Sequence, residues 1–295
     1  MSKKITKALI PAAGFGTRFL PQTKAMPKEM MPLVDKPIIQ RVVEELVEAG
    51  IETIVIVTGI YKRSIEDHFD NNYELEDKLQ NSGKDKELEQ VRKISDLAEF
   101  VYVRQKGPPG NATPILNAKH IMGDDPFMVF WGDDFVDAQP SRAQQLIDAY
   151  EKYGTTIMGG LKARNDEDYK KYAFAAGVEV EKGVIRLSRI IEKPGKENAP
   201  SDLGIVSGYV YTPDIYEYLE KAKEGLNLNE ELVYTYGVQG MIDAGIDVHA
   251  IEMQNAVYRD TGNKLEYLKT VVQYGLKHVE FGEEFKEYLD SLKDQ

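Results

Sequence analysis

Short runs of β-branched and aromatic residues alternate with longer segments of helical periodicity along most of this 295-residue chain. This alternation is typical of βαβ units, in which consecutive strands lie parallel and helices cover the sheet. Residues 51–59 (IETIVIVTG) form the continuous apolar run of a central parallel strand, which is buried on both faces. We therefore predict an α/β fold with a Rossmann-like, mixed but mainly parallel central sheet flanked by helices.

The same patterns predict the other elements. Further strands are expected at 7–13, 100–105, 127–134, 155–163 and 204–211, with a hairpin over 173–192. Helices are expected at 36–49, near 141–153, from Pro213 onward and over 263–292, and residues 61–98 are charged and helix-prone. No internal repeat or low-complexity linker interrupts the chain, so we predict a single domain over 1–295.

The first strand is followed by a polar loop from Gly14 to about Asp35, whereas βα connections usually have about 2 to 6 residues. Gly14 and Gly16 open this loop at the carboxyl end of the strand, where open α/β sheets bind ligands. Glycine permits positive φ and close backbone approach, so successive N–H groups can converge on phosphate oxygens. A tight turn is the structural alternative for two glycines alone.

Positive side chains distinguish this loop from a simple turn. Arg18, Lys24 and Lys28 follow the glycines, and Thr17 and Thr23 add hydroxyl donors. The third glycine of a dinucleotide-binding GxGxxG motif is absent, and no GK[ST] triplet of a P-loop is present. The pattern favours a loop whose side chains neutralise a triphosphate.

Composition excludes several classes of function. The formal net charge of −12 repels polyanions, so neither a nucleic acid nor an anionic membrane is expected as a partner. The absence of cysteine excludes disulfides and thiolate-bound metals, and no apolar stretch approaches the roughly 18 residues of a membrane helix. The basic then apolar start lacks a convincing cleavage site, so we interpret it as the first buried strand of a cytoplasmic protein.

Two further segments end predicted strands with charged residues. Asp133 and Asp134 follow the apolar residues of 127–132, at the sheet edge expected for the glycine loop. Carboxylate oxygens at this edge suit Mg²⁺ bound to a triphosphate, although an acidic loop or helix cap is an equally good interpretation of the pair alone. Glu192 and Lys193 end another apolar run before a proline, which alone indicates only a solvated charge pair.

Residues 14–37 (GFGTRFLPQTKAMPKEMMPLVDKP) resemble the bacterial UTP-glucose-1-phosphate uridylyltransferases, within the sugar-phosphate nucleotidylyltransferase family. Weaker similarity continues through VRQ, GDD, IEKP and RDTGNK. The resemblance implies a fold of the nucleotide-diphospho-sugar transferase type, with a nucleotide-binding half over about 1–140 and a sugar-binding and C-terminal helical half over about 141–295. It also implies a Mg²⁺-dependent reaction of UTP with glucose 1-phosphate that forms UDP-glucose and pyrophosphate.

The resemblance also implies roles for individual residues. Arg18, Lys28 and Lys193 are the expected catalytic cations, and Asp133 and Asp260 the expected metal ligands, with Asp134 left as a supporting or structural residue. The expected nucleotide contacts are Ala12, Ala13, Gly14, Gly16, Thr17, Glu29, Gln105 and Gly110. The expected sugar contacts are Glu192, Lys193 and Ala173.

The chain departs from the family pattern around the base and the sugar, at residues 110–114, 172–173 and 231–236. The same reaction with dTTP or an N-acetylhexosamine 1-phosphate, or a non-catalytic sugar-nucleotide-binding regulator, therefore remain alternatives. The resemblance further implies a homo-oligomer, and apolar residues at near-helical spacing in the C-terminal helix, among them Leu265 and Leu268, offer a surface for packing on the chain's own core or on a second subunit.

Overall fold

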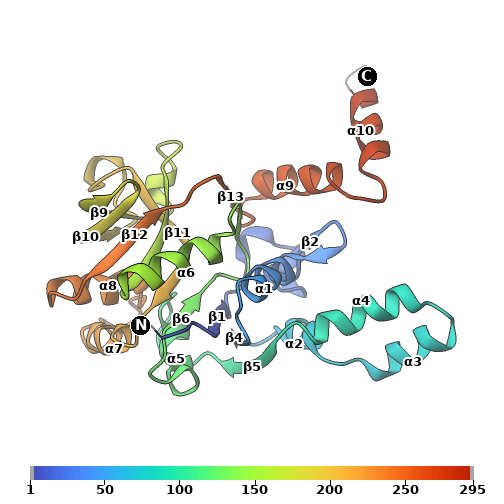
Figure 1. The fold of residues 1–295 in the computed structure, drawn as a ribbon, viewed down its shortest axis with the longest axis horizontal. Helices are drawn as coiled ribbons and strands as arrows, with labels where there is room; N and C mark the ends of the chain where they lie inside the picture. Colours follow the sequence, from blue (N-terminus) through green and yellow to red (C-terminus); the bar gives the residue numbers. More distant parts are fainter. Residues whose placement is uncertain (1–2, 293–295) are drawn as a thin grey trace.

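The structure is a computed structural model that describes residues 3–292. Its centre is a nine-stranded sheet with strand order β5-β4-β1-β6-β11-β8-β12-β10-β9 (Figure 1). The strands of this sheet are β1 (Lys7–Ala12), β4 (Thr53–Thr58), β5 (Glu99–Arg104), β6 (Phe127–Val129), β8 (Thr156–Lys162), β9 (Ala173–Glu181), β10 (Val184–Glu192), β11 (Leu203–Tyr211) and β12 (Val248–Glu252). Two short ribbons pair β2 (Pro32–Leu33) with β3 (Lys36–Pro37), and β7 (Phe135–Ala138) with β13 (Ala256–Arg259).

The described residues contain ten α-helices. They are α1 (Ile38–Glu48), α2 (Arg63–Phe69), α3 (Tyr73–Asn81), α4 (Asp85–Ser95), α5 (Thr113–Met122), α6 (Arg142–Tyr153), α7 (Ile215–Glu224), α8 (Tyr234–Asp243), α9 (Lys264–Leu276) and α10 (Gly282–Ser291). Helices α3 and α4 project from one side as a hairpin, and α9 and α10 form an arm that extends away from the sheet (Figure 1). No helix in 3–292 is long and apolar enough to cross a membrane.

The N-terminal half of the sheet is parallel. Strand β1 pairs in parallel with β4 and β6, and β4 pairs in parallel with β5. The carboxyl ends of these strands therefore meet at one edge. The second half is mixed, because β11 runs antiparallel to both β6 and β8 while β12 runs parallel to β8.

The apolar run of β4 is explained by burial on both faces of the sheet. Ile54 and Ile56 belong to the core cluster formed with α1 and α6, whereas Val55 and Val57 belong to the cluster formed with α5, α7 and α8. Successive side chains of a strand point to opposite faces, so a strand between two helical layers needs apolar residues at every position.

The structure differs from the sequence predictions at particular elements. The first helix begins at Ile38 rather than Lys36, because Lys36 and Pro37 pair with β2. Helix α5 was not predicted, because Gly and Pro precede it and Pro114 lies in its first turn. Proline is tolerated there, because the backbone N–H that it lacks would have no partner within the helix. The expected C-terminal helix is two helices, α9 and α10. The hairpin over 173–192 is confirmed, with Gly183 at φ 76° in its turn.

Candidate active site

The loop after β1 folds back over the edge at which the parallel strands end. Gly16 has φ 64° and begins a short 3-10 turn (Thr17–Phe19), and its carbonyl accepts a 2.6 Å hydrogen bond from the Thr23 hydroxyl. A Cβ at Gly16 would lie 3.2 Å from the Cβ of Lys28, and one at Gly14 would lie 3.5 Å from the Cε of Lys28. The two glycines therefore leave room for the Lys28 side chain to pass along the loop.

Lys28 reaches an acid of the predicted metal site. Its Nζ lies 2.5 Å from Oδ2 of Asp133, which follows β6. Burial lowers the pKa of Lys28, but the attraction of Asp133, Glu29 and Asp134 outweighs burial and leaves the pKa above its usual value. Lys28 is therefore a permanent cation beside a carboxylate at neutral pH.

The ribbon of β7 and β13 brings together two acids that lie far apart in sequence. Phe135 pairs with Arg259, so Asp133 and Asp260 both lie just beyond the same end of this ribbon. The Thr261 hydroxyl donates a hydrogen bond to the Asp133 carbonyl, which ties the two segments together. Asp260 is itself oriented by the Gly262 N–H, which donates a 3.1 Å bond to its Oδ1.

Arg18 joins this group from the glycine loop. A Cβ built at Gly262 would lie 2.8 Å from Nη1 of Arg18 and 3.1 Å from Oδ1 of Asp260. The guanidinium and the carboxylate therefore flank the same glycine. Of the predicted phosphate-side residues, the structure brings Gly14, Gly16, Arg18, Lys28, Asp133 and Asp260 into one cluster.

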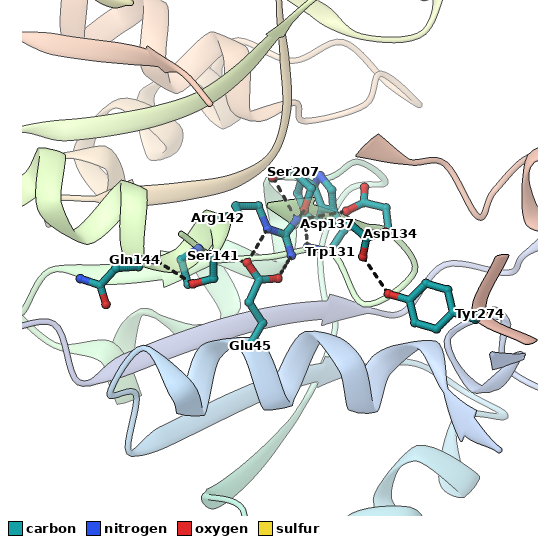
Figure 2. Close-up of polar contacts among 10 residues, drawn as sticks. Glu45, Trp131, Asp134, Asp137, Ser141, Arg142, Gln144, Ser207 and Tyr274 are labelled. Atoms are coloured by element: carbon teal, nitrogen blue, oxygen red, sulfur yellow. Dashed lines mark hydrogen bonds and ion pairs between the residues drawn. The ribbon is translucent and has the colours of Figure 1, made fainter. Parts of the chain in front are cut away.

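Asp134 faces the interior and belongs to a buried polar network (Figure 2). Its Oδ2 accepts a 2.9 Å bond from the Tyr258 hydroxyl, and its Oδ1 lies 3.6 Å from Nη1 of Arg142. Arg142 is 0% exposed and bonds Glu45 and Ser207. Burial raises the pKa of Asp134 to about 7, against the attraction of Arg142.

Glu29 lies under the loop rather than on its surface. It is 0% exposed, and its Oε2 accepts a 2.6 Å bond from Nζ of the buried Lys62, while its Oε1 has no hydrogen-bond partner. Burial raises the pKa of Glu29 and lowers the pKa of Lys62, because both charges have lost water. An unpaired buried carboxylate oxygen is costly unless another group binds it.

The predicted sugar-side residues meet at the ends of β9 and β10. Ala173 pairs with Glu192, and the Lys193 N–H donates a 3.2 Å bond to the Tyr172 carbonyl. Burial raises the pKa of Glu192, whose Oε2 lies 3.5 Å from the Thr235 hydroxyl. The Tyr172 hydroxyl lies 3.5 Å from Oδ2 of Asp260, so this group adjoins one acid of the predicted metal site.

A pocket of about 300 Å³ opens beside the phosphate-side cluster, at the ends of β4 and β5. It is lined by Thr58, Gly59, Ile60, Tyr61, Arg104 and Gln105. A Cβ at Gly59 would lie 3.1 Å from the Ala13 carbonyl, so the pocket borders the start of the glycine loop. Of the predicted base-side residues, Gln105 lines this pocket and Ala13 touches its border, whereas Glu29 and Gly110 are not among its lining residues.

Gly110 packs instead against a distant segment. It has φ 127°, and a Cβ there would lie 2.1 Å from the Leu232 carbonyl oxygen. Next to it, the Asn111 side chain accepts a 2.9 Å bond from the Tyr234 N–H. Residues 110–114 and 231–236, which both depart from the family pattern, are therefore in direct contact.

Sequence reasoning missed Lys62, Arg142, Thr235 and Tyr258. Lys62, Thr235 and Tyr258 each contact a predicted residue across many positions of the chain. Arg142 contacts the nearby Asp134 and is held by the distant Glu45, so no local motif marks any of the four. Among residues 3–292, no three His, Cys, Asp or Glu side chains are grouped to hold a metal ion. The predicted metal ligands are therefore the two carboxylates of Asp133 and Asp260. This number suits Mg²⁺, because the ion commonly takes one or two protein carboxylates and completes its shell with substrate phosphates and water.

Comparison with known proteins gives consistent matches over nearly the whole chain. The family model "Nucleotidyl transferase" matches residues 7–275. A UTP–glucose-1-phosphate uridylyltransferase of Staphylococcus epidermidis is 44% identical over 290 residues, which cover 98% of this chain and 99% of that protein. A UDP-glucose pyrophosphorylase complexed with UDP-glucose superposes with a TM-score of 0.82 at 36% identity, covering 93% of this chain and 100% of that chain. A UTP-bound UGPase from Acinetobacter baumannii gives a TM-score of 0.84 at 36% identity, covering 97% and 99%.

Proposed function

This chain belongs to the nucleotidyl transferase family, and on that basis we propose that it joins UTP to glucose 1-phosphate and releases pyrophosphate. The relatives named above carry this activity or these ligands in their descriptions. The observation that supports the proposal most directly is the 2.5 Å contact of Lys28 with Asp133, beside Arg18 and Asp260. Such a cluster can bind a triphosphate and a divalent cation at one place.

The proposed reaction is an in-line displacement. An oxygen of the sugar phosphate forms a bond to the α-phosphorus of UTP, and the bond from that phosphorus to the bridging oxygen of pyrophosphate breaks. The nucleophile is already anionic at neutral pH, so no general base and no covalent intermediate are required. The main barrier is the mutual repulsion of two anions, which positioned cations reduce.

Each cation has a proposed part in that displacement. Arg18 and Lys28 neutralise the triphosphate from the glycine loop, while the N–H groups near Gly14, Gly16 and Thr17 approach its oxygens. Lys193 binds the phosphate of the incoming sugar, and Glu192 accepts hydrogen bonds from sugar hydroxyls beside Ala173. Lys193 has φ 43°, a left-handed conformation that is uncommon for this residue type.

We propose that Asp133 and Asp260 hold Mg²⁺. When bound, this ion neutralises charge on the phosphate oxygens and orients them for the displacement. In the structure Nζ of Lys28 lies 2.5 Å from Oδ2 of Asp133, so Lys28 would turn from this oxygen to a phosphate when the ion binds. Asp134 lies on the buried side of this site, where Tyr258 and Arg142 hold its carboxylate in place.

For the base, we propose contacts with Gln105, the backbone near Ala12 and Ala13, Gly110 and Glu29. Uracil presents one imide N–H between two carbonyls, so it needs an acceptor flanked by donors. The amide of Gln105 lines the pocket at the ends of β4 and β5. Oε1 of Glu29, which has no hydrogen-bond partner, is an acceptor beneath the glycine loop.

The function is tested by turnover. Purified protein is incubated with Mg²⁺, UTP and glucose 1-phosphate, and pyrophosphate release is followed; parallel mixtures replace UTP by dTTP, replace the sugar phosphate by N-acetylglucosamine 1-phosphate, or omit Mg²⁺. We expect the first mixture to be fastest and the mixture without Mg²⁺ to be inactive. Faster release with dTTP or the amino sugar would reassign the substrates. Silence in all mixtures combined with binding of UDP-glucose would support a regulator.

We also propose one nucleotidylyltransferase domain, a homo-oligomeric assembly and a cytoplasmic location. The central sheet takes strands from both halves of the chain, which supports the single domain. Leu265 and Leu268 are exposed on the projecting arm, which supports a contact with a second copy. The absence of cysteine, and therefore of disulfides, is compatible with a reducing compartment, which supports the cytoplasmic location. Light scattering of the Leu268→Glu variant tests the assembly, since a smaller particle is expected.

A further inference from the structure

We infer that Tyr61 is a stacking platform for the nucleobase, an affinity-determining residue that lies at the mouth of the pocket beside Gln105. The inference rests on the proposed function, because it takes the ligand to be a nucleoside triphosphate whose phosphates occupy the glycine loop. It adds a residue that none of the sequence patterns above singled out.

The position of the pocket fits a base. Thr58 and Arg104 pair at the ends of β4 and β5, and the Gln105 N–H donates a 2.9 Å bond to the Thr58 carbonyl, so the two strand ends form a continuous floor. Gly59 approaches the Ala13 carbonyl, one strand away from the phosphate loop. A nucleotide whose phosphates lie at Gly14 and Gly16 would therefore place its base over this floor.

The pocket is lined by polar side chains on one part of its surface and by apolar side chains on another. Arg104 donates a hydrogen bond to the Gly59 carbonyl and lies 3.7 Å from Glu66, so its guanidinium is engaged by the protein. Within residues 3–292, the side chains of Gln105 and Tyr61 make no hydrogen bond. Ile60 and Tyr61 supply the apolar surface, and their side chains are 65% and 77% exposed.

The backbone of Tyr61 is unfavourable for this residue type. Its φ is 66°, in the left-handed region where the Cβ of a bulky side chain is crowded and glycine is preferred. Packing of the ring does not offset this strain, because the ring is mostly exposed to solvent. Local strain that the fold does not need is characteristic of ligand sites. A bound base would give the ring the contact that it lacks in the free protein.

Stacking on an aromatic ring uses the π face that every base presents. Tyr61 should therefore increase affinity for UTP and dTTP alike, while the polar edge of Gln105 distinguishes between bases. The ring makes no contact with the phosphates in this arrangement. A ligand that carries three phosphates and no base should be indifferent to Tyr61.

The test uses isothermal titration calorimetry of the full chain with UTP and with inorganic tripolyphosphate, both with Mg²⁺. In Tyr61→Gly and in Tyr61→Asn, which both tolerate the left-handed backbone, we expect the Kd for UTP to rise roughly tenfold and the Kd for tripolyphosphate to stay unchanged. Tyr61→Phe should bind UTP as the wild type does. Tyr73→Ala, which removes another exposed tyrosine at the start of α3, is the matched control and should change neither constant.

Stability gives an independent readout. Tyr61→Gly should unfold at an equal or higher urea concentration than the wild type, because the strain is removed and no packing is lost.

Unchanged UTP affinity in both Tyr61→Gly and Tyr61→Asn would overturn the inference, as would an equal loss for UTP and tripolyphosphate. An equal loss in Tyr61→Phe would assign the effect to the hydroxyl and would also overturn it. Absence of turnover in the wild type would refute the proposed reaction, whereas the ratio of the two Kd values tests the platform separately.

Discussion

Arg142 donates two hydrogen bonds to the carboxylate of Glu45, one of 2.8 Å from Nη2 and one of 3.3 Å from Nε, in the interior of the protein (Figure 2). Its Nη1 reaches the Ser207 carbonyl at 3.1 Å, and its guanidinium lies 3.9 Å from the ring centroid of Phe130. The absence of a side chain at Gly208 makes room for the Arg142 stem, since a Cβ there would lie 2.8 Å from its Cδ. This arrangement compensates two buried acids, Glu45 and Asp134.

Replacing Arg142 by methionine should destabilise the protein by about 3 to 5 kcal/mol, because Glu45 and Asp134 would remain buried without a positive partner. Urea unfolding followed by circular dichroism measures this loss. Lys221→Met is the control, since it breaks an exposed pair with Glu217 on α7 and should leave the midpoint unchanged. A loss below about 1 kcal/mol for Arg142→Met would show that the network is not a stabilising one.

Replacing Lys28 by methionine should lower kcat/KM for pyrophosphate release by about 100-fold or more, because a positioned cation is lost where charge develops on the phosphates. The pKa of Lys28 is raised, so this lysine should contribute no change in rate across neutral pH. Lys152→Met, which removes a surface lysine 2.6 Å from Glu181, is the control and should retain wild-type rates.

The same variant separates a role at the proposed metal site from a general loss of folding. Without Lys28, the Asp133 carboxylate loses its positive neighbour, so the nucleotide-free protein should bind Mn²⁺ more tightly than the wild type does. Electron paramagnetic resonance of free Mn²⁺ measures this binding. Weaker Mn²⁺ binding together with wild-type turnover would remove Lys28 from both the metal site and the reaction.

Eight of the nine strands of the central sheet were predictable because they depend on local composition. Strand β12 (Val248–Glu252) was missed, and the strand predicted over 127–134 ends at Val129. The apolar run that became β4 needs no knowledge of its neighbours, and the glycine loop follows a strand directly. Contacts made only in the folded chain were not predictable. Arg142 lies 97 positions from Glu45, and Tyr258 lies 124 positions from Asp134, so neither pair forms a motif.

Helix α5 shows a second reason for a missed element. Its start reads as a loop, because Gly107, Pro108, Pro109 and Gly110 precede it and Pro114 lies within its first turn. The helix is fixed by burial of Ile115, Ala118 and Met122 against the sheet, which local propensity does not reveal. Glu29 illustrates the same point for the site, since its burial and its pairing with Lys62 depend on packing of the whole loop.

Replacing Gly110 by alanine should destabilise the protein by about 3 kcal/mol and reduce UTP turnover. The added Cβ would lie 2.1 Å from the Leu232 carbonyl oxygen, and φ 127° is unfavourable for alanine. Gly154→Ala is the matched control, because Gly154 also has a positive φ of 67° in the left-handed region but no atom lies within 4 Å of the new Cβ. It should cost only about 1 kcal/mol and leave turnover intact. Equal losses in the two variants would show that the contact of 110–114 with 231–236 is unimportant.

His249 should make the stability of the protein depend on pH below about 6.5. Its ring is buried on β12, stacks on Tyr153 with the ring centroids 4.5 Å apart, and has Nδ1 2.9 Å from the Thr155 hydroxyl. Burial lowers the pKa of His249, and the nearby Arg186 lowers it further, while Asp247 opposes both.

Because the pKa of His249 in the folded state lies below its unfolded value, the unfolded chain binds more protons in this range. Its contribution to stability is therefore complete above the unfolded pKa and is lost as the pH falls toward the folded pKa. His249→Gln retains a polar group for Thr155 but does not titrate. Urea unfolding of both proteins between pH 5 and pH 8 should show a wild-type curve that falls more steeply below pH 6.5, by at most about 1.4 kcal/mol per pH unit. Parallel curves would mean that the buried imidazole protonates in the folded protein as readily as in the unfolded chain.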